Sequence, residues 1–108
     1  MESQLNTNEV FRALADPTRR AILGRLRAGR QPVGSLARSF PVSRPAISKH
    51  LRILREAKLV IDQKQGRERF CELNVEPLRQ VDQWLDEYRR FWAVNLERLK
   101  SYVESTEQ

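Results

Sequence analysis

The sequence predicts a mainly α-helical fold with one small β-hairpin, and three observations lead to this prediction. Apolar residues recur at helical spacing in five separate stretches, which predicts five helices. One stretch instead reads as two short strands around a Gln65–Arg67 turn. The chain has 108 residues, of which 40% are hydrophobic. This size suits one small domain over residues 1–108 with a modest core.

The charge is distributed unevenly along the chain. The formal net charge is +6, and no acidic residue occurs between Pro17 and Arg55, a run that holds ten lysines and arginines. Residues 12–69 carry 15 basic and 4 acidic residues, whereas residues 70–108 carry a net charge of −3. A basic head on an acidic C-terminal part indicates a polyanionic partner, and nucleic acid is the first candidate.

Two helices are expected before residue 30. Asn6 is expected to cap the first, with Glu9 reaching back to it. Its apolar face contains Val10, Phe11 and Leu14. Asp16 followed by Pro17 predicts the N-cap and first turn of the second helix, which Gly29 is expected to stop. The buried side of this second helix is predicted to contain Ala21, Ile22, Leu23 and Leu26.

The next two helices are expected to be joined by a tight turn at residues 41–43. A brief helix is predicted over residues 34–39, after an extended link at Pro32–Val33. Its inward side chains are predicted to be Val33, Leu36, Ala37 and Phe40. Ser43 is expected to cap a longer helix from Arg44 to about Lys58.

This longer helix has two distinct faces. Its buried stripe is predicted from the spacing of Ile47, Leu51 and Leu54. Its outer side is predicted to present Arg44, Pro45, Ser48, Lys49 and Arg52. Pro45 lies in the first turn, where its missing N–H costs little.

A hairpin and a last helix complete the chain. Leu59 is expected to begin the first strand, and residues 69–73 form the second, with Lys64, Arg67 and Arg69 near the tip. Asn74 is expected to cap a last helix over residues 75–103. At about 1.5 Å per residue, this helix would be roughly 40 Å long. Its apolar positions are Leu78, Val81, Trp84, Leu85, Tyr88, Phe91, Trp92, Leu96, Leu99 and Val103.

So long an aromatic-rich stripe predicts a homodimer, because a chain of this size has too little core to cover it. The interface is predicted to contain Val10, Leu14, Leu78, Val81, Leu85, Tyr88, Phe91, Trp92, Leu96 and Leu99. Two alternatives stay open. In the first alternative, the helix wraps the core of its own chain. In the second, the aromatic residues line a ligand pocket at the subunit boundary.

A helix, a tight turn, a second helix and a basic hairpin together form a winged helix-turn-helix. A major groove admits one helix, whose polar and basic side chains reach base edges, while phosphate contacts supply most of the affinity. Double-stranded DNA is therefore the predicted partner, with residues 8–73 as the binding core. The predicted contacts are Ser43, Arg44, Pro45, Ser48, Lys49, His50, Arg52, Lys64, Arg67 and Arg69.

Several segments resemble the ArsR/SmtB family of bacterial repressors over about residues 8–100. The matching segments are FRALADPTRRAIL at 11–23, VGSLA at 33–37, VSRPAISKHLRIL at 42–54, AKLV at 57–60 and Gly66-Arg67. The resemblance implies a homodimeric repressor that binds an imperfect inverted repeat and leaves it when an inducer arrives.

The metal-binding residues of that family are missing. Metal sensors of the family often carry Cys-Val-Cys before the short helix, where this chain has Pro32-Val33-Gly34. Another metal site of the family uses aspartate and histidine on the last helix. Here the last helix has Asp82, Asp86 and Glu87 but no histidine, and the whole chain has one cysteine and one histidine. We therefore expect no metal site and no cofactor, and we place the chain in a non-metal-sensing branch.

Four side chains have more than one interpretation. His50 is expected to be a hydrogen-bonded structural histidine or a phosphate contact rather than a metal ligand or proton switch. Cys71 is expected to be a small hydrophobe, with a redox role as the alternative. Arg19 and Arg20 either contact phosphate or are simply exposed.

The function predicted is that of a sequence-specific transcriptional regulator. The alternatives are a nonspecific nucleic-acid coat and a protein-interaction module. An enzyme is not expected, because the chain has no nucleophile with a suitable base and no Gly-rich phosphate loop. A cytoplasmic, nucleoid-associated location is expected, since no apolar run is long enough to span a bilayer and no signal-peptide pattern is present. The sequence does not reveal the inducing signal.

Overall fold

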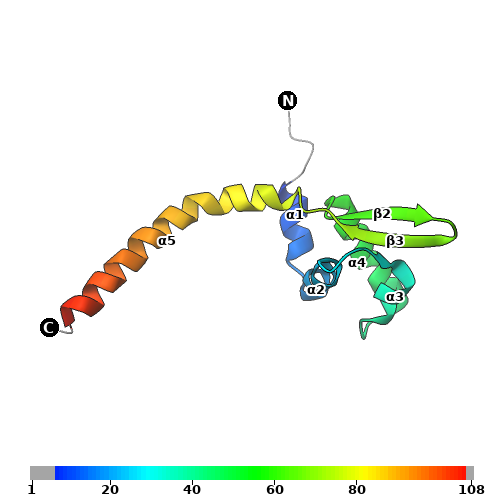
Figure 1. The fold of residues 1–108 in the computed structure, drawn as a ribbon, viewed down its shortest axis with the longest axis horizontal. Coiled ribbons are helices and arrows are strands. Elements are labelled where there is room, and N and C mark those ends of the chain that lie inside the picture. The colour runs from blue at the N-terminus through cyan, green and yellow to red at the C-terminus, as the bar shows by residue number, and fades with distance from the viewer. Residues whose placement is uncertain (1–6, 107–108) are drawn as a thin grey trace, which may run out of the picture.

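The computed structural model describes residues 7–106 of the chain and shows a mainly helical fold with a small antiparallel sheet (Figure 1). The elements are α1 (Thr7–Leu14), α2 (Pro17–Leu26), β1 (Gln31–Pro32), α3 (Val33–Arg38), α4 (Arg44–Glu56), β2 (Val60–Gln65), β3 (Glu68–Leu73) and α5 (Leu78–Thr106). We call residues 7–77 the head and the β2–β3 hairpin the wing. The predicted fold class is confirmed.

Two of the three N-caps predicted within the described residues, at Asp16 and Ser43, are present. The Asp16 carboxylate accepts hydrogen bonds from the backbone N–H groups of Thr18 at 2.8 Å and Arg19 at 3.1 Å. The Ser43 hydroxyl accepts one from the N–H of Ala46 at 3.3 Å. These bonds satisfy N–H groups that lack a partner inside the helix, so they fix where α2 and α4 begin. The cap expected at Asn6 lies outside the described residues.

Helix α4 ends earlier than the sequence predicts. Its last helical residue is Glu56, and Lys58 has a φ of 64°. The Lys58 N–H donates to the Arg55 carbonyl at 2.9 Å, and the Leu59 N–H donates to the Leu54 carbonyl at 3.0 Å. This is a left-handed C-terminal cap, in which a lysine takes the place that glycine usually fills. It turns the chain directly into β2.

The sheet has three strands in the order β1-β3-β2, although the sequence predicted only the hairpin. Residues Gln31 and Pro32 pair with Cys71 and Phe70 of β3, so the expected link is a short edge strand. A two-residue strand that contains proline has no local signal of its own. In the wing, Asp62 lies opposite Cys71 and Lys64 lies opposite Arg69.

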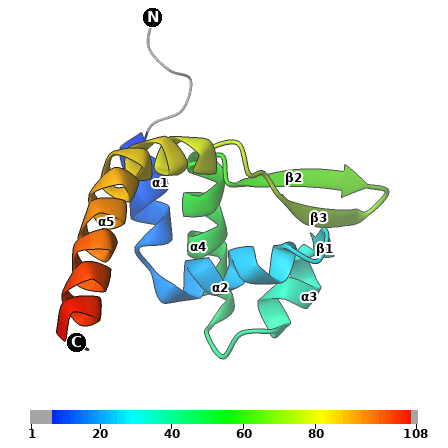
Figure 2. The same cartoon turned by 60° about the vertical axis from the view of Figure 1, so that its left-hand side comes forward.

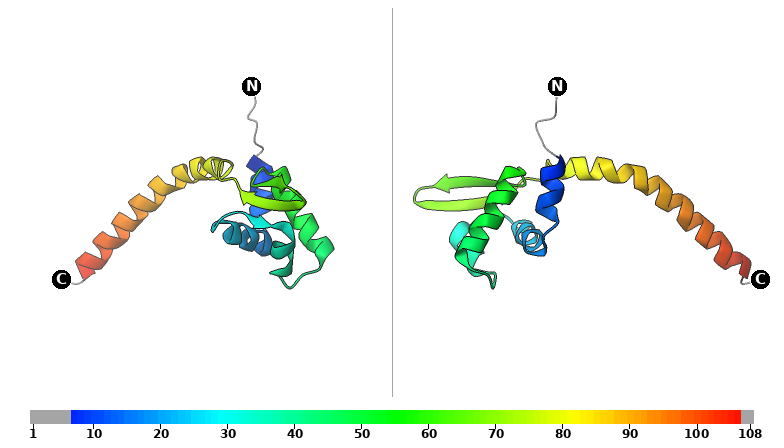
Figure 3. Two further views of the ribbon diagram at one scale, coloured as in Figure 1. Left: turned by 45° about the vertical axis from the view of Figure 1, so that its right-hand side comes forward. Right: turned by 180° about the vertical axis from the view of Figure 1, so that it is seen from behind.

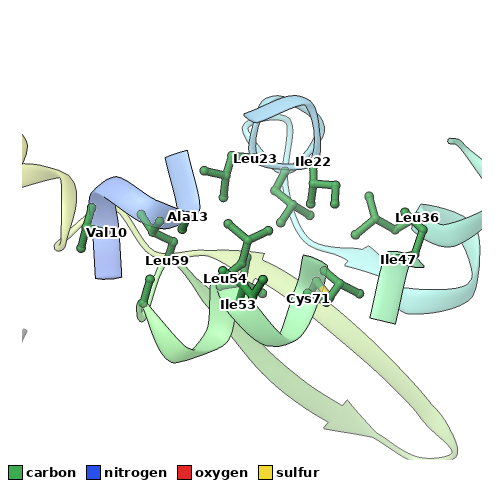
Figure 4. Close-up of a cluster of buried hydrophobic side chains, with 14 residues drawn as sticks. Val10, Ala13, Ile22, Leu23, Leu36, Ile47, Ile53, Leu54, Leu59 and Cys71 are labelled. Atoms are coloured by element: carbon green, nitrogen blue, oxygen red, sulfur yellow. The ribbon is translucent and has the colours of Figure 1, made fainter. Parts of the chain in front are cut away.

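The core lies between α1, α2, α3, α4 and the sheet (Figure 4). Ile47, Leu51 and Leu54 are all buried, which confirms the predicted stripe of α4. Ile53 is also buried, which was not predicted. Ala21 is exposed, contrary to prediction. It lies about 100° around α2 from Ile22, on the side away from Leu23.

Helix α5 leaves the head on the side opposite the wing tip and continues alone (Figures 1 and 3). None of its 29 residues is fully buried. Leu78, Val81 and Leu85 are half-buried near its start, and the Trp84 ring meets the Phe11 ring of α1 at 5.2 Å between centroids. Beyond that contact its large apolar side chains are exposed, so the stripe is not covered by its own head.

Asn74 does not cap α5, which begins four residues later. Its side-chain N–H donates to the Lys58 carbonyl at 2.8 Å, and its side-chain oxygen accepts from the Glu76 N–H at 3.4 Å. Asn74 therefore ties the end of the wing to the turn after α4. Within residues 7–106, no helix combines the length and the apolar character needed to cross a membrane.

Candidate nucleic-acid interface

The outer face of α4 is exposed as predicted. Ser43, Arg44, Pro45, Ser48, Lys49 and Arg52 are all solvent-accessible. In Figure 2, α4 runs down the head beside α2, with the wing projecting from its upper end. No hydrogen bond or ion pair joins Arg44, Lys49 or Arg52 to another described residue. Their charges are thus free to meet a polyanion, while the opposite side of the helix anchors it in the core.

The wing brings the three predicted basic residues together but gives them different surroundings. Lys64 and Arg67 are exposed and have no side-chain partner in the described part of the chain. Arg69 is also exposed, but its guanidinium lies 3.8 Å from the Asp62 carboxylate. The same carboxylate pairs with Arg55 of α4 at 3.3 Å. Arg69 is therefore partly neutralised within the molecule, and Asp62 links the wing to α4.

Arg30 contacts the face of the wing that carries Gln63 and Phe70, and the sequence did not predict a role for this residue. Its guanidinium carbon lies 4.4 Å from the centroid of the Phe70 ring, a cation–π contact. Its terminal nitrogens donate to the side-chain oxygens of Gln63 at 3.2 Å and Gln65 at 2.7 Å. These partners lie more than thirty residues away, so no local pattern signals the contact.

His50 does not share the exposed face of α4. Its side chain is 17% exposed, and Nδ1 lies 3.1 Å from the Arg19 guanidinium and 3.9 Å from the Asp16 carboxylate. It is therefore a hydrogen-bonded histidine, one of the alternatives that the sequence left open. Arg20 is exposed, and one of its nitrogens donates to the Leu14 carbonyl at 2.7 Å.

Cys71 is fully buried on β3, with its sulfur 3.8 Å from an Asp62 carboxylate oxygen. Burial, followed by the negative charge of Asp62, raises the pKa of the thiol from 9.0 to about 11. A buried thiol that stays protonated at neutral pH is a weak nucleophile. The residue fits the expected role of a small core hydrophobe.

The Cys71 thiol is expected to resist alkylation while the protein is folded. At pH 8 the raised pKa leaves about a hundredfold less thiolate than in the unfolded chain, and burial slows access further. Iodoacetamide labelling followed by mass spectrometry measures the rate, with the same chain in urea as the control. Equal rates in both conditions would contradict the assignment. The contribution of this thiol to stability is present below pH 9 and is lost as the pH rises toward about 11.

The described residues offer no metal site. Within residues 7–106, no group of three or more histidine, cysteine, aspartate or glutamate side chains lies close enough to hold an ion. On α5, the Asp86 carboxylate accepts from Arg89 at 2.7 Å, and Asp82 accepts from the same guanidinium. Two of the three α5 carboxylates named in the sequence comparison, Asp82 and Asp86, are thus paired with an arginine.

A capped helix with free cations on its outer face, preceded by a helix and a tight turn and followed by a basic wing, defines the class of winged helix-turn-helix DNA-binding regulators. A family described as "helix-turn-helix domain" matches residues 14–63. The chain is 41% identical over 105 residues to the HTH-type transcriptional regulator Rv2034 of Mycobacterium tuberculosis, covering 97% of this chain and 95% of that protein.

Two further similarities agree. The transcriptional repressor SdpR of Bacillus subtilis is 40% identical over 78 residues, which cover 72% of this chain and 87% of that protein. The solved structure of an ArsR-like transcriptional regulator from Rhodococcus sp. RHA1 superposes with a TM-score of 0.69 at 37% identity, covering 88% of this chain and 90% of that one. The protein belongs to the ArsR/SmtB family of helix-turn-helix transcriptional regulators. It is a DNA-binding regulator and not an enzyme.

Proposed function

We propose that the protein is a homodimeric repressor that binds an imperfect inverted repeat in DNA and does not respond to metal ions. The observation that supports this most directly is the outer face of α4, where three cations have no partner among the described residues. Transcriptional repression is the activity named for SdpR, which is 40% identical to this chain. Acting on the chromosome, the protein would work in the cytoplasm on the nucleoid.

The dimer is supported by the apolar stripe of α5. Phe91 is 63% exposed, Leu96 is 64% exposed and Leu99 is 58% exposed. A helix with such a stripe and no fully buried residue needs a partner surface, and a second α5 offers the same stripe in return. Two heads related by a twofold axis would present two copies of α4 to major grooves about one helical turn apart.

The residues of the head divide into two roles. Arg44, Ser48, Lys49 and Arg52 on α4 read base edges and the adjacent phosphates. Lys64 and Arg67 on the wing hold phosphates, and Arg69 contributes less because Asp62 already pairs with it. The α4 residues supply the sequence preference, and the wing residues supply affinity for any duplex.

The absence of metal control is supported by the donor set. The chain has a single cysteine and a single histidine, and both are engaged inside the head, Cys71 in the core and His50 with Arg19. Asp82 and Asp86 are paired with Arg89. These residues do not form the thiolate or aspartate–histidine sites that metal sensors of the family use.

Substitution of α4 residues should weaken specific binding more than nonspecific binding. Arg52→Ala and Lys49→Ala are each expected to cost about 1–3 kcal/mol on promoter DNA of the protein's own gene. Arg67→Ala is expected to weaken binding to all sequences alike and to reduce the salt slope by about 1. Fluorescence anisotropy at several salt concentrations, with random DNA as competitor, measures all three.

The matched control is Arg90→Ala, which removes one exposed arginine from α5, far from the wing. It should leave both affinities unchanged. Equal binding to promoter and random DNA by the wild-type protein would instead support a nonspecific coat. No measurable DNA affinity at physiological salt would favour the protein-interaction module.

A further inference from the structure

The Arg19 side chain is occupied by contacts inside the head. Its Nε donates to the Ala13 carbonyl at 2.9 Å, and Nη2 donates to the Arg12 carbonyl at 3.0 Å. These two carbonyls belong to the last turn of α1, where carbonyl groups lack partners inside the helix. Its remaining terminal nitrogen, Nη1, lies 3.1 Å from Nδ1 of His50 in the middle of α4. One guanidinium thus bridges the end of α1 and the proposed reading helix.

The backbone of Arg19 is fixed by the cap of α2. Asp16 accepts from the N–H groups of Thr18 and Arg19, and Pro17 occupies the first position of the helix. The Asp16 carboxylate also lies 3.9 Å from Nδ1 of His50. The start of α2 therefore holds the guanidinium in place from one side while α1 holds it from another.

The contact with His50 has a defined polarity. Arginine has five N–H donors and no acceptor. Nδ1 of His50 must therefore accept the hydrogen bond, which places the imidazole proton of the neutral ring on Nε2. The charged groups that face this ring are Arg19 and Asp16. The planar fork of arginine makes all three contacts at once, which the single ammonium of lysine does not.

We propose that Arg19 is a positioning residue for DNA recognition, which sets the orientation of α4 relative to α1 through His50. The proposal rests on the proposed function, in which α5 joins the two chains and α4 contributes the contacts to DNA. Val10, which the sequence placed in the dimer interface, is instead fully buried in the core of the head, and α1 meets α5 through the Phe11–Trp84 ring contact. A rotation of α4 on α1 would then change the angle at which both reading helices of a dimer enter the grooves. This role differs from a phosphate contact by Arg19, which the sequence left open.

Conservative variants separate the two roles. Arg19→Lys keeps the charge but loses the fork, and Arg19→Gln loses both. His50→Asn keeps an acceptor at the δ position, whereas His50→Leu removes it. We expect Arg19→Lys, Arg19→Gln and His50→Leu each to weaken promoter binding by roughly tenfold, and His50→Asn to stay within about threefold of wild type. The double variant Arg19→Gln/His50→Leu should be no weaker than the Arg19→Gln variant, because both changes break the same Arg19–His50 contact.

Two further readouts exclude a merely structural explanation. The slope of affinity against salt should not change in any of these variants, and binding to random DNA should stay at the wild-type level. Urea titrations give the free energy of unfolding of each variant at the temperature of the binding assay. The assay temperature is chosen so that every variant is more than about 95% folded, and lost affinity then does not reflect unfolded protein. Arg90→Gln is the charge-matched control.

Three results decide the matter. If Arg19→Lys binds as wild type while Arg19→Gln flattens the salt slope, Arg19 contacts phosphate and the inference is wrong. If Arg52→Ala weakens promoter binding but no Arg19 or His50 variant does, the inference fails and the proposed function stands. If Arg52→Ala keeps full promoter affinity, α4 is not the reading helix and both proposals fall together.

Discussion

Leu96→Glu in α5 is expected to convert the proposed dimer into monomers and to lower promoter affinity by at least about a hundredfold. Leu96 is 64% exposed in the single chain, so the change is harmless to the head itself. In a pair of α5 helices, however, two carboxylates would enter an apolar interface without partners. The loss of affinity follows because each monomer holds only one half-site, and the gain from linking two binding heads is on the order of 100- to 10,000-fold.

Sedimentation equilibrium and anisotropy titration measure the two effects on one sample. The matched control is Glu97→Gln, at the adjacent exposed position, which should leave the dimer and its affinity intact. A Leu96→Glu protein that remains dimeric at micromolar concentration would show that α5 is not the interface. A monomer with full promoter affinity would show that one head suffices.

Leu54→Ala is expected to destabilise the head by about 2–5 kcal/mol. Leu54 is fully buried on the inner face of α4, in the cluster that joins this helix to α2 and the sheet (Figure 4). Removing three carbon atoms there takes apolar area back into water and leaves a cavity that the neighbours fill only in part. The urea midpoint should fall accordingly.

Unfolding of a dimer depends on concentration, so wild type and variant are compared at one protein concentration. Val94→Ala is the control, because Val94 is 51% exposed on α5 and its truncation is expected to change stability by less than about 0.5 kcal/mol. A loss for Leu54→Ala no larger than that of the control would mean that α4 is not packed as described.

The parts of the fold that were predicted correctly depend on local chemistry. The caps at Asp16 and Ser43, the stripe of α4 and the exposed basic face all follow from residues within a few positions of one another. The wing was found from its turn residues, and Gly66 indeed has a φ of +65°. Local sequence patterns, namely helical periodicity, cap residues and turn residues, were therefore sufficient to find the helices, the hairpin and most of the candidate interface.

The parts that were missed depend on contacts between distant segments. The edge strand at Gln31–Pro32 exists because β3 pairs with it about forty residues later. Arg30 reaches the wing across a similar interval, and Arg19 meets His50 thirty-one residues away. The early end of α4 at Glu56 was missed for another reason. Lys58 has a left-handed backbone conformation, which in most proteins is occupied by glycine, so the sequence carries no glycine to mark the end of the helix.

The exposure of the apolar side chains of α5 has a consequence for newly synthesised copies of the protein. Isolated helices are marginal in water, and beyond Leu85 no other segment within residues 7–106 shields this one. A solitary copy therefore carries an extension with exposed aromatic side chains, which the proposed dimer would protect from proteases. If copies pair as proposed, scarce copies would be cleared while abundant ones persist, and the cellular level of the regulator would respond steeply to its rate of synthesis.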